Sequence, residues 1–509
     1  MKTKNTFYNS IASIIYYLAT IGLGIFSRKV LISILGIEYQ GINGLFSNIL
    51  SMLSIAELGI GMTMIYHLYQ PLKNKDVLAI QTLMYFYKKC YIGIAGIIFS
   101  IGILIIPVLK YIIHDYSLPY SLPAIYIWFL LDSVCSYLFS YKRSILIADQ
   151  KNYWVIFCDI IYQLSSKFLQ VIVLLCSHSF ILYLFTMIIC RLVSNLIISY
   201  IANKRYPFLK HLKKQPIPTT VFLDIKQKVK GSFFHKIGGF VVLGTDNILI
   251  SKYLGLTSVG IYSNYSLIIN SIKSICTQTL TASTASVGHL LIEKDTKKTY
   301  EIFMQLYILN GALINCATTG IYCVTTPLIG QIFGKKYLIS EFTLFILALN
   351  FCITGMRTVF SVFKEAGGIL YEDRFIPIIE SFINLLTSLV FLHYFGLAGV
   401  FMGTIFSSTI LFTYTYPCLI YKKILGRTIG EYWKEILWFE ILALVSMIIS
   451  KHICNSIITT NILVQIGFYI VVSICIPNIL FILFYAYWKP ETKALIKRCK
   501  TIFRKNIIR

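Results

Sequence analysis

The chain has 509 residues, of which 57% are hydrophobic and only 13% are charged. Soluble proteins carry about 25% charged residues, so this composition excludes a soluble enzyme or a soluble binding domain. The net charge of +25 does not indicate nucleic-acid binding, because the basic residues occupy short segments between apolar runs. We therefore predict an all-α polytopic membrane protein.

The apolar runs predict about fourteen transmembrane helices. A helix needs roughly 20 apolar residues to cross a bilayer. In chain order the predicted spans are 7–27, 41–65, 84–108, 121–141, 154–176, 180–202, 236–252, 259–285, 301–327, 341–363, 375–395, 399–421, 437–450 and 463–487. The first run is too long for the core of a signal peptide, so it is interpreted as the first span.

The basic residues predict the orientation of the chain. An even number of spans places both termini on one side, and the segments of that side hold 35 Lys and Arg residues against seven on the other. Cytoplasmic loops carry such an excess, so both termini are predicted to be cytoplasmic. The longest loop, 203–236, is also cytoplasmic in this topology. Apolar residues recur there at helical spacing among lysines, which predicts an amphipathic helix on the membrane surface.

An internal repeat predicts the domain organisation. The pairs Gly36/Gly255 and Gly41/Gly260 are separated by 219 residues, and comparable offsets relate Pro107 to Pro327 and Asp159 to Glu380. The repeat unit contains six spans, so its copies share an orientation and are related by a pseudo-two-fold axis along the membrane normal. The predicted domains are a lobe 1–202, a linker 203–236, a second lobe 237–421, and two additional helices with a basic tail, 422–509.

Motifs of ATP hydrolysis and of serine hydrolases are absent from the sequence. It has no Walker A motif and no GxSxG elbow. Its cysteines form no CxxC pair. The predicted protein is therefore not an enzyme and uses no metal or cofactor. Carriage across the membrane is the remaining function.

Ionisable residues inside the predicted spans mark the candidate site, because such residues are costly in a bilayer. Arg28, Lys273 and Arg357 predict a cationic cavity that receives an anion. The acidic residues predicted to act in coupling or gating are Glu57, Asp159, Asp246 and Glu380. Arg28 and Asp246 lie at matching depth on the first helices of the two halves, which predicts a gating ion pair.

Other roles stay open for several of these groups. In the alternative interpretation, Arg28 is not part of a site. Its long side chain then snorkels to the outer lipid headgroups. Asp159 and Glu380 equally suit stabilisation of helix N-termini. Lys167 and Arg191 also lie within spans, where pairing with a neighbouring helix or snorkelling is the alternative to a functional role.

Four segments resemble the Wzx-type polysaccharide flippases, which belong to the same superfamily as the MATE exporters. They are Arg28–Gly61, Tyr66–Asp76, Lys236–Tyr265 and Lys364–Leu386. The resemblance implies two six-helix lobes, a central cavity and alternating access. It implies transfer of an oligosaccharide on undecaprenyl pyrophosphate from the inner to the outer leaflet of the bacterial cytoplasmic membrane, for O-antigen, capsule or exopolysaccharide assembly. By this resemblance, Arg28 and Arg357 receive the pyrophosphate and sugars.

Partners and competing functions follow from the same interpretation. The expected partners are the lipid-linked oligosaccharide, membrane lipids, H⁺ or Na⁺ as a coupling ion, and a polysaccharide polymerase. A MATE-type ion-coupled multidrug exporter is the alternative, which Glu57 and Asp246 keep open because cationic drugs favour carboxylates. A polysaccharide polymerase or ligase is the third possibility. It is disfavoured because every predicted outer loop is short.

Overall fold

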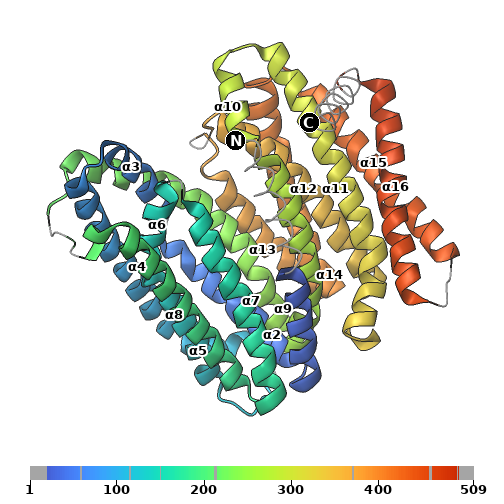
Figure 1. Ribbon diagram of the computed structural model, residues 1–509. Coiled ribbons are helices and arrows are strands. Elements are labelled where there is room, and N and C mark those ends of the chain that lie inside the picture. Colours follow the sequence, from blue (N-terminus) through green and yellow to red (C-terminus); the bar gives the residue numbers. More distant parts are fainter. Residues whose placement is uncertain are drawn as a thin grey trace, which may run out of the picture. The chain divides into compact units, whose positions relative to one another are not determined.

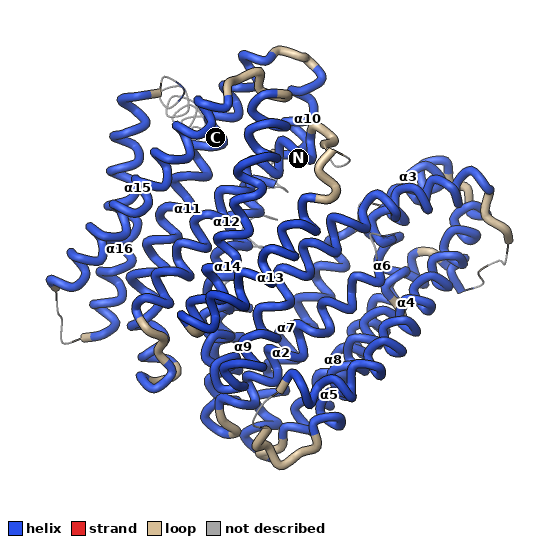
Figure 2. The backbone as a smooth tube through the Cα atoms, turned by 180° about the vertical axis from the view of Figure 1, so that it is seen from behind, coloured by secondary structure: helices blue, strands red, loops and turns tan. Residues whose placement is uncertain are grey.

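The computed structural model describes residues 20–57, 60–113, 116–149, 151–210, 212, 215–281, 283–369, 372–457, 461–489 and 491. Most of the first predicted span, 7–27, and most of the basic C-terminal tail lie outside the described residues. Within them the secondary structure consists of helices joined by short loops, as Figure 2 shows. The chain is an all-α polytopic membrane protein, as the composition predicted.

Ten stretches of the described residues are long and apolar enough to cross a membrane. They comprise α4 (Val77–Ile112), α5 with α6 (Leu122–Tyr137 and Ser140–Ala148), α7 (Asn152–Ser177), α8 (Phe180–Arg205), α11 (Thr296–Ile332), α12 (Glu341–Ala366), α13 (Ile376–Phe395), α14 with the π-helix η4 (Leu397–Ile410 and Leu411–Lys422), α15 (Ile429–Ser456) and α16 (Ile462–Trp488). Each coincides with a predicted span, so ten of the fourteen spans are found as apolar helices.

Three further predicted spans fall on helices with a more polar composition. The span 41–65 is interrupted, because α2 (Ile37–Leu53) leads through the short 3₁₀-helix η1 (Ser54–Glu57) into α3 (Ile60–Asn74). The spans 236–252 and 259–285 lie on α9 (Thr219–Thr281), which is interrupted at Gly255. Polar helices are tolerated at membrane depth where they face protein or a water-filled cavity instead of lipid.

Two compact units divide the chain, Met1–Ser263 and Asn264–Arg509, with the division inside α9. In the first unit α5 packs against α4 and α8, α7 packs against α8, and α3 against α6 (Figure 1). In the second unit α11 contacts α12, α15 and α16, and α14 packs against α12 and α13. The short helices η2 (Pro207–Lys210), α10 (Thr284–Ile292) and η3 (Lys335–Tyr337) connect the longer ones. The domain boundaries derived from the sequence stay predictions.

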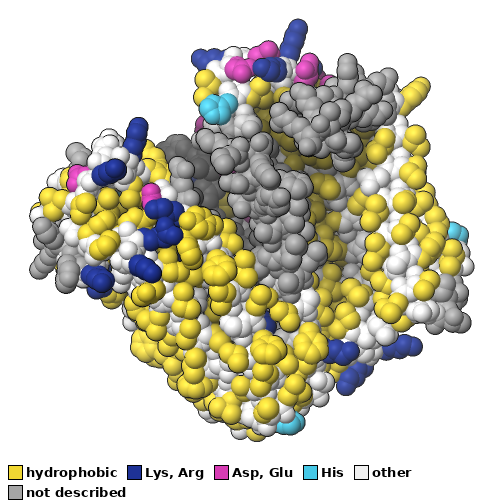
Figure 3. Space-filling model, in the orientation of Figure 1, with side chains coloured by type: hydrophobic (Ala, Val, Ile, Leu, Met, Phe, Trp, Pro, Cys, Tyr) yellow, Lys and Arg dark blue, Asp and Glu magenta, His cyan; other side chains and the backbone are white. Residues whose placement is uncertain are grey.

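The surface of the first unit is that of a lipid-exposed protein. Large apolar side chains such as Leu104, Phe168 and Leu196 are more than half exposed. Figure 3 shows hydrophobic side chains along this flank, with Lys and Arg gathered at the end that carries α3 and α6. This separation places the apolar flank in the bilayer and the basic end in water.

The repeat is visible in the backbone. Gly36, before α2, has φ 107° and ψ 169°, and Gly255, which interrupts α9, has φ 81° and ψ 169°. The structure extends the repeat to Lys75–Asp76 and Lys294–Asp295, which are again 219 residues apart. Both lysines have positive φ. Both aspartates accept a hydrogen bond from a backbone N–H three residues later, at the start of α4 and α11.

Gly41 and Gly260 bring the two copies of the glycine motif into direct backbone contact. A Cβ on Gly41 would collide with the carbonyl group of Leu256, and a Cβ on Gly260 would collide with the carbonyl oxygen of Ile37. The helix α2 and the part of α9 after Gly255 therefore cross at the distance that small residues permit in membranes.

We expect Gly41→Ala to destabilise the protein, because its methyl group meets a backbone carbonyl that cannot rotate away. Overpacking of this kind costs about 1–3 kcal/mol, which thermal unfolding of the purified protein detects as a lower Tm. Gly96→Ala on α4 is the matched control, since nothing lies within 4 Å of a Cβ there. Equal Tm values for the two variants would contradict the close crossing.

Candidate substrate site within the membrane-spanning helices

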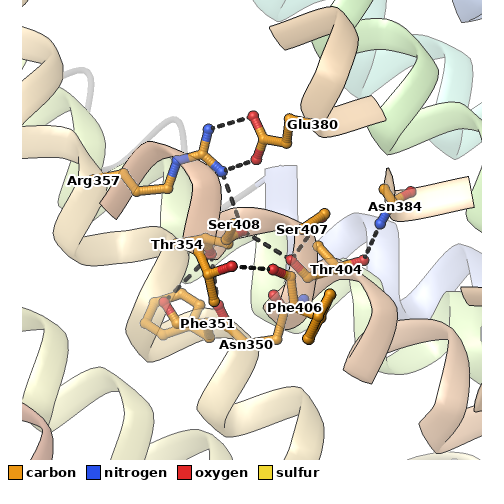
Figure 4. A network of polar contacts seen from close by, with 11 residues as sticks. Asn350, Phe351, Thr354, Arg357, Glu380, Asn384, Thr404, Phe406, Ser407 and Ser408 are labelled. Carbon is orange, nitrogen blue, oxygen red and sulfur yellow. Dashed lines mark hydrogen bonds and ion pairs between the residues drawn. The ribbon is translucent and has the colours of Figure 1, made fainter. Parts of the chain in front are cut away.

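A polar network in the second unit surrounds Arg357, a residue of α12 (Figure 4). Its Nη1 donates to Oε1 of Glu380 on α13 at 2.6 Å, and its Nη2 donates to Oε2 of Glu380 at 3.2 Å. Nη1 also donates to Oγ of Ser408 on α14 at 3.3 Å. The Glu380 side chain is 5% exposed and the Arg357 side chain 25%. The guanidinium of α12 is therefore bound by side chains of α13 and α14, and the Arg357 side chain as a whole stays partly exposed.

Small and hydroxylated residues allow α13 and α14 to approach closely enough to build this network. A Cβ at Gly399 would collide with the backbone of Phe391, and one at Gly403 would collide with Ser388. Asn384 donates through Nδ2 to Oγ1 of Thr404 at 3.1 Å, as Figure 4 shows. Interfaces of small residues with interhelical hydrogen bonds are typical of packing in membranes.

Lys273, on α9, adds a second positive charge to this part of the second unit. It is partly buried, and it has no hydrogen bond or ion pair to any described residue. It lies close enough to Arg357 for the two like charges to repel one another. The arrangement combines a paired cation with an unpaired one, which together attract an anion.

The first unit contains a comparable pair of cations. Arg28 donates from Nη1 to the backbone carbonyl oxygen of Ser263. The charge of Lys167 on α7 repels that of Arg28. Lys167 donates to Oε1 of Gln170 at 3.4 Å. Each unit therefore contains two basic side chains near one another, within helices of a membrane protein.

The four predicted acidic residues have different surroundings. The hydroxyl of Tyr91 donates to Oε1 of Glu57 at 3.4 Å. Asp159 pairs with Arg143, 2.7 Å from its Nη1, and Glu380 pairs with Arg357. Oδ1 of Asp246 is buried without a hydrogen-bond partner among the described residues. Arg28 forms no ion pair with a described residue, so the predicted Arg28–Asp246 pair is not formed in this structure.

Sequence reasoning missed several partners of these charges. Arg191 on α8 forms two hydrogen bonds of 3.1 Å with the carboxylate of Asp132 on α5, and its guanidinium lies over the Tyr162 ring. This ion pair fits the alternative interpretation of Arg191, in which it pairs with a neighbouring helix. Glu440, on α15, is a further partly buried carboxylate in a membrane-spanning helix. A charge within an apolar run is the signal that would have identified Asp132 and Glu440.

Comparison with known proteins gives the fold. No family model and no curated protein sequence matches the chain. Among solved structures, the lipid II flippase MurJ in an inward closed conformation is similar, with a TM-score of 0.66, 15% identity, and coverage of 94% of this chain and 99% of that one. An inward-facing MATE family multidrug transporter of the MOP superfamily gives a TM-score of 0.63 at 14% identity, covering 77% and 91%.

The chain has the fold of the MATE and lipid II flippase transporters. A further MATE structure, in the bent conformation, is similar at a TM-score of 0.52 and 13% identity, covering 82% of this chain and 94% of that chain. Identities this low establish the fold and not the substrate. The MATE-like fold that the sequence resemblance implied is confirmed.

Proposed function

We propose that the protein is a flippase for oligosaccharide repeat units linked to undecaprenyl pyrophosphate, acting by alternating access without ATP. In this proposal the protein transfers the lipid-linked oligosaccharide from the inner to the outer leaflet of the bacterial cytoplasmic membrane, where it is used to assemble a surface polysaccharide. Both termini are cytoplasmic in this proposal, in keeping with the 35 to seven distribution of basic residues. A coupling ion, H⁺ or Na⁺, and a polysaccharide polymerase are the further partners it names.

The observation that carries this proposal is the pairing of like charges in each unit. Lys273 lies near Arg357, and Lys167 lies near Arg28. Glu380 already neutralises Arg357, so Lys273 is the charge that stays without an acidic partner among the described residues. An unpaired cation in a low-dielectric region is unfavourable unless an anion joins it. A pyrophosphate offers several oxygens to such donors, and arginine presents a planar fork that suits phosphate. The similarity to the lipid II flippase MurJ supports a lipid-linked substrate.

A multidrug exporter is the alternative, which the structural similarity to MATE transporters supports. The buried, unpartnered carboxylate oxygen of Asp246 is the observation in its favour, because a cationic drug or a proton binds a carboxylate. The two functions differ in the sign of the charge that crosses the membrane, so one experiment separates them.

The test uses the full chain in vesicles that contain an undecaprenyl-pyrophosphate-linked oligosaccharide in one leaflet. A potassium diffusion potential that draws anions to the opposite leaflet should accelerate flipping, since each charge gains ~2.3 kcal/mol per 100 mV. A membrane-impermeant glycosidase reports which sugars have crossed. Flipping no faster than in protein-free vesicles, or uptake of a cationic dye in its place, would refute the flippase proposal.

A further inference from the structure

A cavity of about 630 Å³ is lined in part by the segment Tyr66–Asp76. This segment does not belong to the candidate substrate site described above. The cavity lies between the end of α3 and the start of α4. Its other wall contains four residues around the start of α9, namely Gln215, Pro216, Pro218 and Val221. Every described residue that lines it belongs to the first unit. Its size falls within the range of about 300–1,000 Å³ that is usual for small-molecule sites.

The exposed residues of the lining include two tyrosines and three amides, together with Asp76, Leu78, Pro216 and Pro218. Tyr66 is 59% exposed and Tyr69 is 51% exposed. Tyr66, Tyr69 and Gln70 occupy positions i, i+3 and i+4 of α3, so they lie on one face of the helix. Asn74 and Gln215 are also exposed and add two further amides. The cavity therefore combines ring surfaces with groups that both donate and accept hydrogen bonds.

This lining matches the chemistry of a neutral sugar. The C–H face of a pyranose packs on an aromatic ring, and its hydroxyl groups pair with amides, which donate and accept at once. None of the described residues that line the cavity is Lys or Arg. The one histidine, His67, has its Nε2 3.1 Å from Oδ2 of Asp224. Among the described lining residues, the polar groups are therefore hydroxyls, amides, the Asp76 carboxylate and an imidazole that is paired with a carboxylate.

The walls of the cavity are fixed by packing around it. Asp76 caps α4 by accepting a hydrogen bond from the Ala79 N–H at 2.9 Å. On the opposite wall, the ring of Phe222 meets Phe86 with a centroid distance of 6.2 Å, and Ile225 is buried. The predicted amphipathic segment is therefore anchored on α3 and α4. Preorganised walls of this kind lower the entropy cost of ligand binding.

We propose that this cavity is a second saccharide site, which binds a neutral sugar unit of the oligosaccharide that the protein carries. The inference rests on the proposed flippase function for the origin of that sugar. The cavity is formed by α3, at the end of the first unit where Lys and Arg gather (Figure 3), which is the predicted cytoplasmic side. At this position the cavity binds one sugar unit of the lipid-linked oligosaccharide before the substrate is translocated.

The experiment measures binding of the full chain, in lipid nanodiscs free of glycoside detergent, to an array of soluble neutral mono-, di- and trisaccharides. The wild-type protein should bind at least one of them. Tyr69→Ala and Gln70→Ala should each weaken that binding about tenfold, the loss expected for one ring contact or one bidentate amide. Tyr69→Phe keeps the ring and should bind nearly as the wild type does.

Tyr253→Ala is the matched control, because Tyr253 is a tyrosine of the same unit that is 50% exposed and does not line the cavity. It should leave binding unchanged. Absence of binding to any neutral saccharide, binding of anionic saccharides only, or undiminished binding by Tyr69→Ala would each overturn the proposal. The flipping assay decides the proposed function separately, since wild-type protein that flips the lipid yet binds no free sugar refutes this site alone.

Discussion

Arg357→Met should both destabilise the second unit and abolish flipping of the lipid-linked oligosaccharide. The substitution leaves Glu380, with a 5% exposed side chain, as an unpaired carboxylate among α12, α13 and α14. Removing one partner of a buried ion pair costs about 3–5 kcal/mol. Thermal unfolding of the purified protein measures the first effect, and the vesicle assay measures the second.

The double variant Arg357→Met/Glu380→Gln separates the two effects. Replacing both charges restores most of the stability, because no unpaired ion remains. Flipping should stay lost, because the cation that receives the pyrophosphate is still missing. Wild-type flipping by the double variant would show that Arg357 serves only the fold.

Arg191→Met/Asp132→Asn is the matched control for this pair. It also removes a two-bonded arginine–carboxylate pair between helices, with side chains 28% and 12% exposed. Because neither of these groups is assigned to the substrate, the double variant should keep both its stability and its flipping rate.

Lys273→Met should have opposite effects on stability and on transport. The charge of Lys273 has no described partner and repels that of Arg357, so its removal should leave the Tm unchanged or raise it. Flipping should fall about tenfold to a hundredfold, since a hydrogen bond to a charged group contributes about 1.5–3 kcal/mol. Methionine keeps most of the volume of the side chain, so packing is little altered.

Lys252→Met controls for the loss of one positive charge, because Lys252 is an exposed residue of α9 that lies before its interruption at Gly255. It should leave both the Tm and the flipping rate at the wild-type level. A lowered Tm for Lys273→Met, with flipping reduced only in proportion to the folded protein, would make Lys273 a structural residue.

Composition and apolar run length were sufficient to predict the fold class and ten of the spans. The bounds of the helices differ because hydropathy reports on solvation and not on backbone conformation. The predicted span 84–108 lies within α4, which begins at Val77 because Asp76 caps its first turn. The predicted span 41–65 is interrupted by η1, which contains Glu57, and a charge within an apolar run does not tell whether the helix continues through it.

The candidate site was predictable only as a set of charges. Arg357 and Glu380 were both identified from the sequence, with one assigned to the substrate and the other to coupling. Their pairing depends on how α12 and α13 are rotated about their axes, which the sequence pattern does not report. The cavity beside α3 was also missed as a site, because it needs residues 215–221 to complete it.

The repeated Lys–Asp pair before α4 and α11 has a consequence for the history of the chain. Lys75 and Lys294 share a left-handed backbone, and Asp76 and Asp295 share the same capping role, at the spacing that also relates Gly36 to Gly255. Turn and cap geometry have thus outlasted most of the side-chain similarity between the halves. This is the signature of gene duplication, followed by divergence of most side chains. An ancestral protein of a single half, working as a symmetric homodimer, is the natural precursor of such a chain.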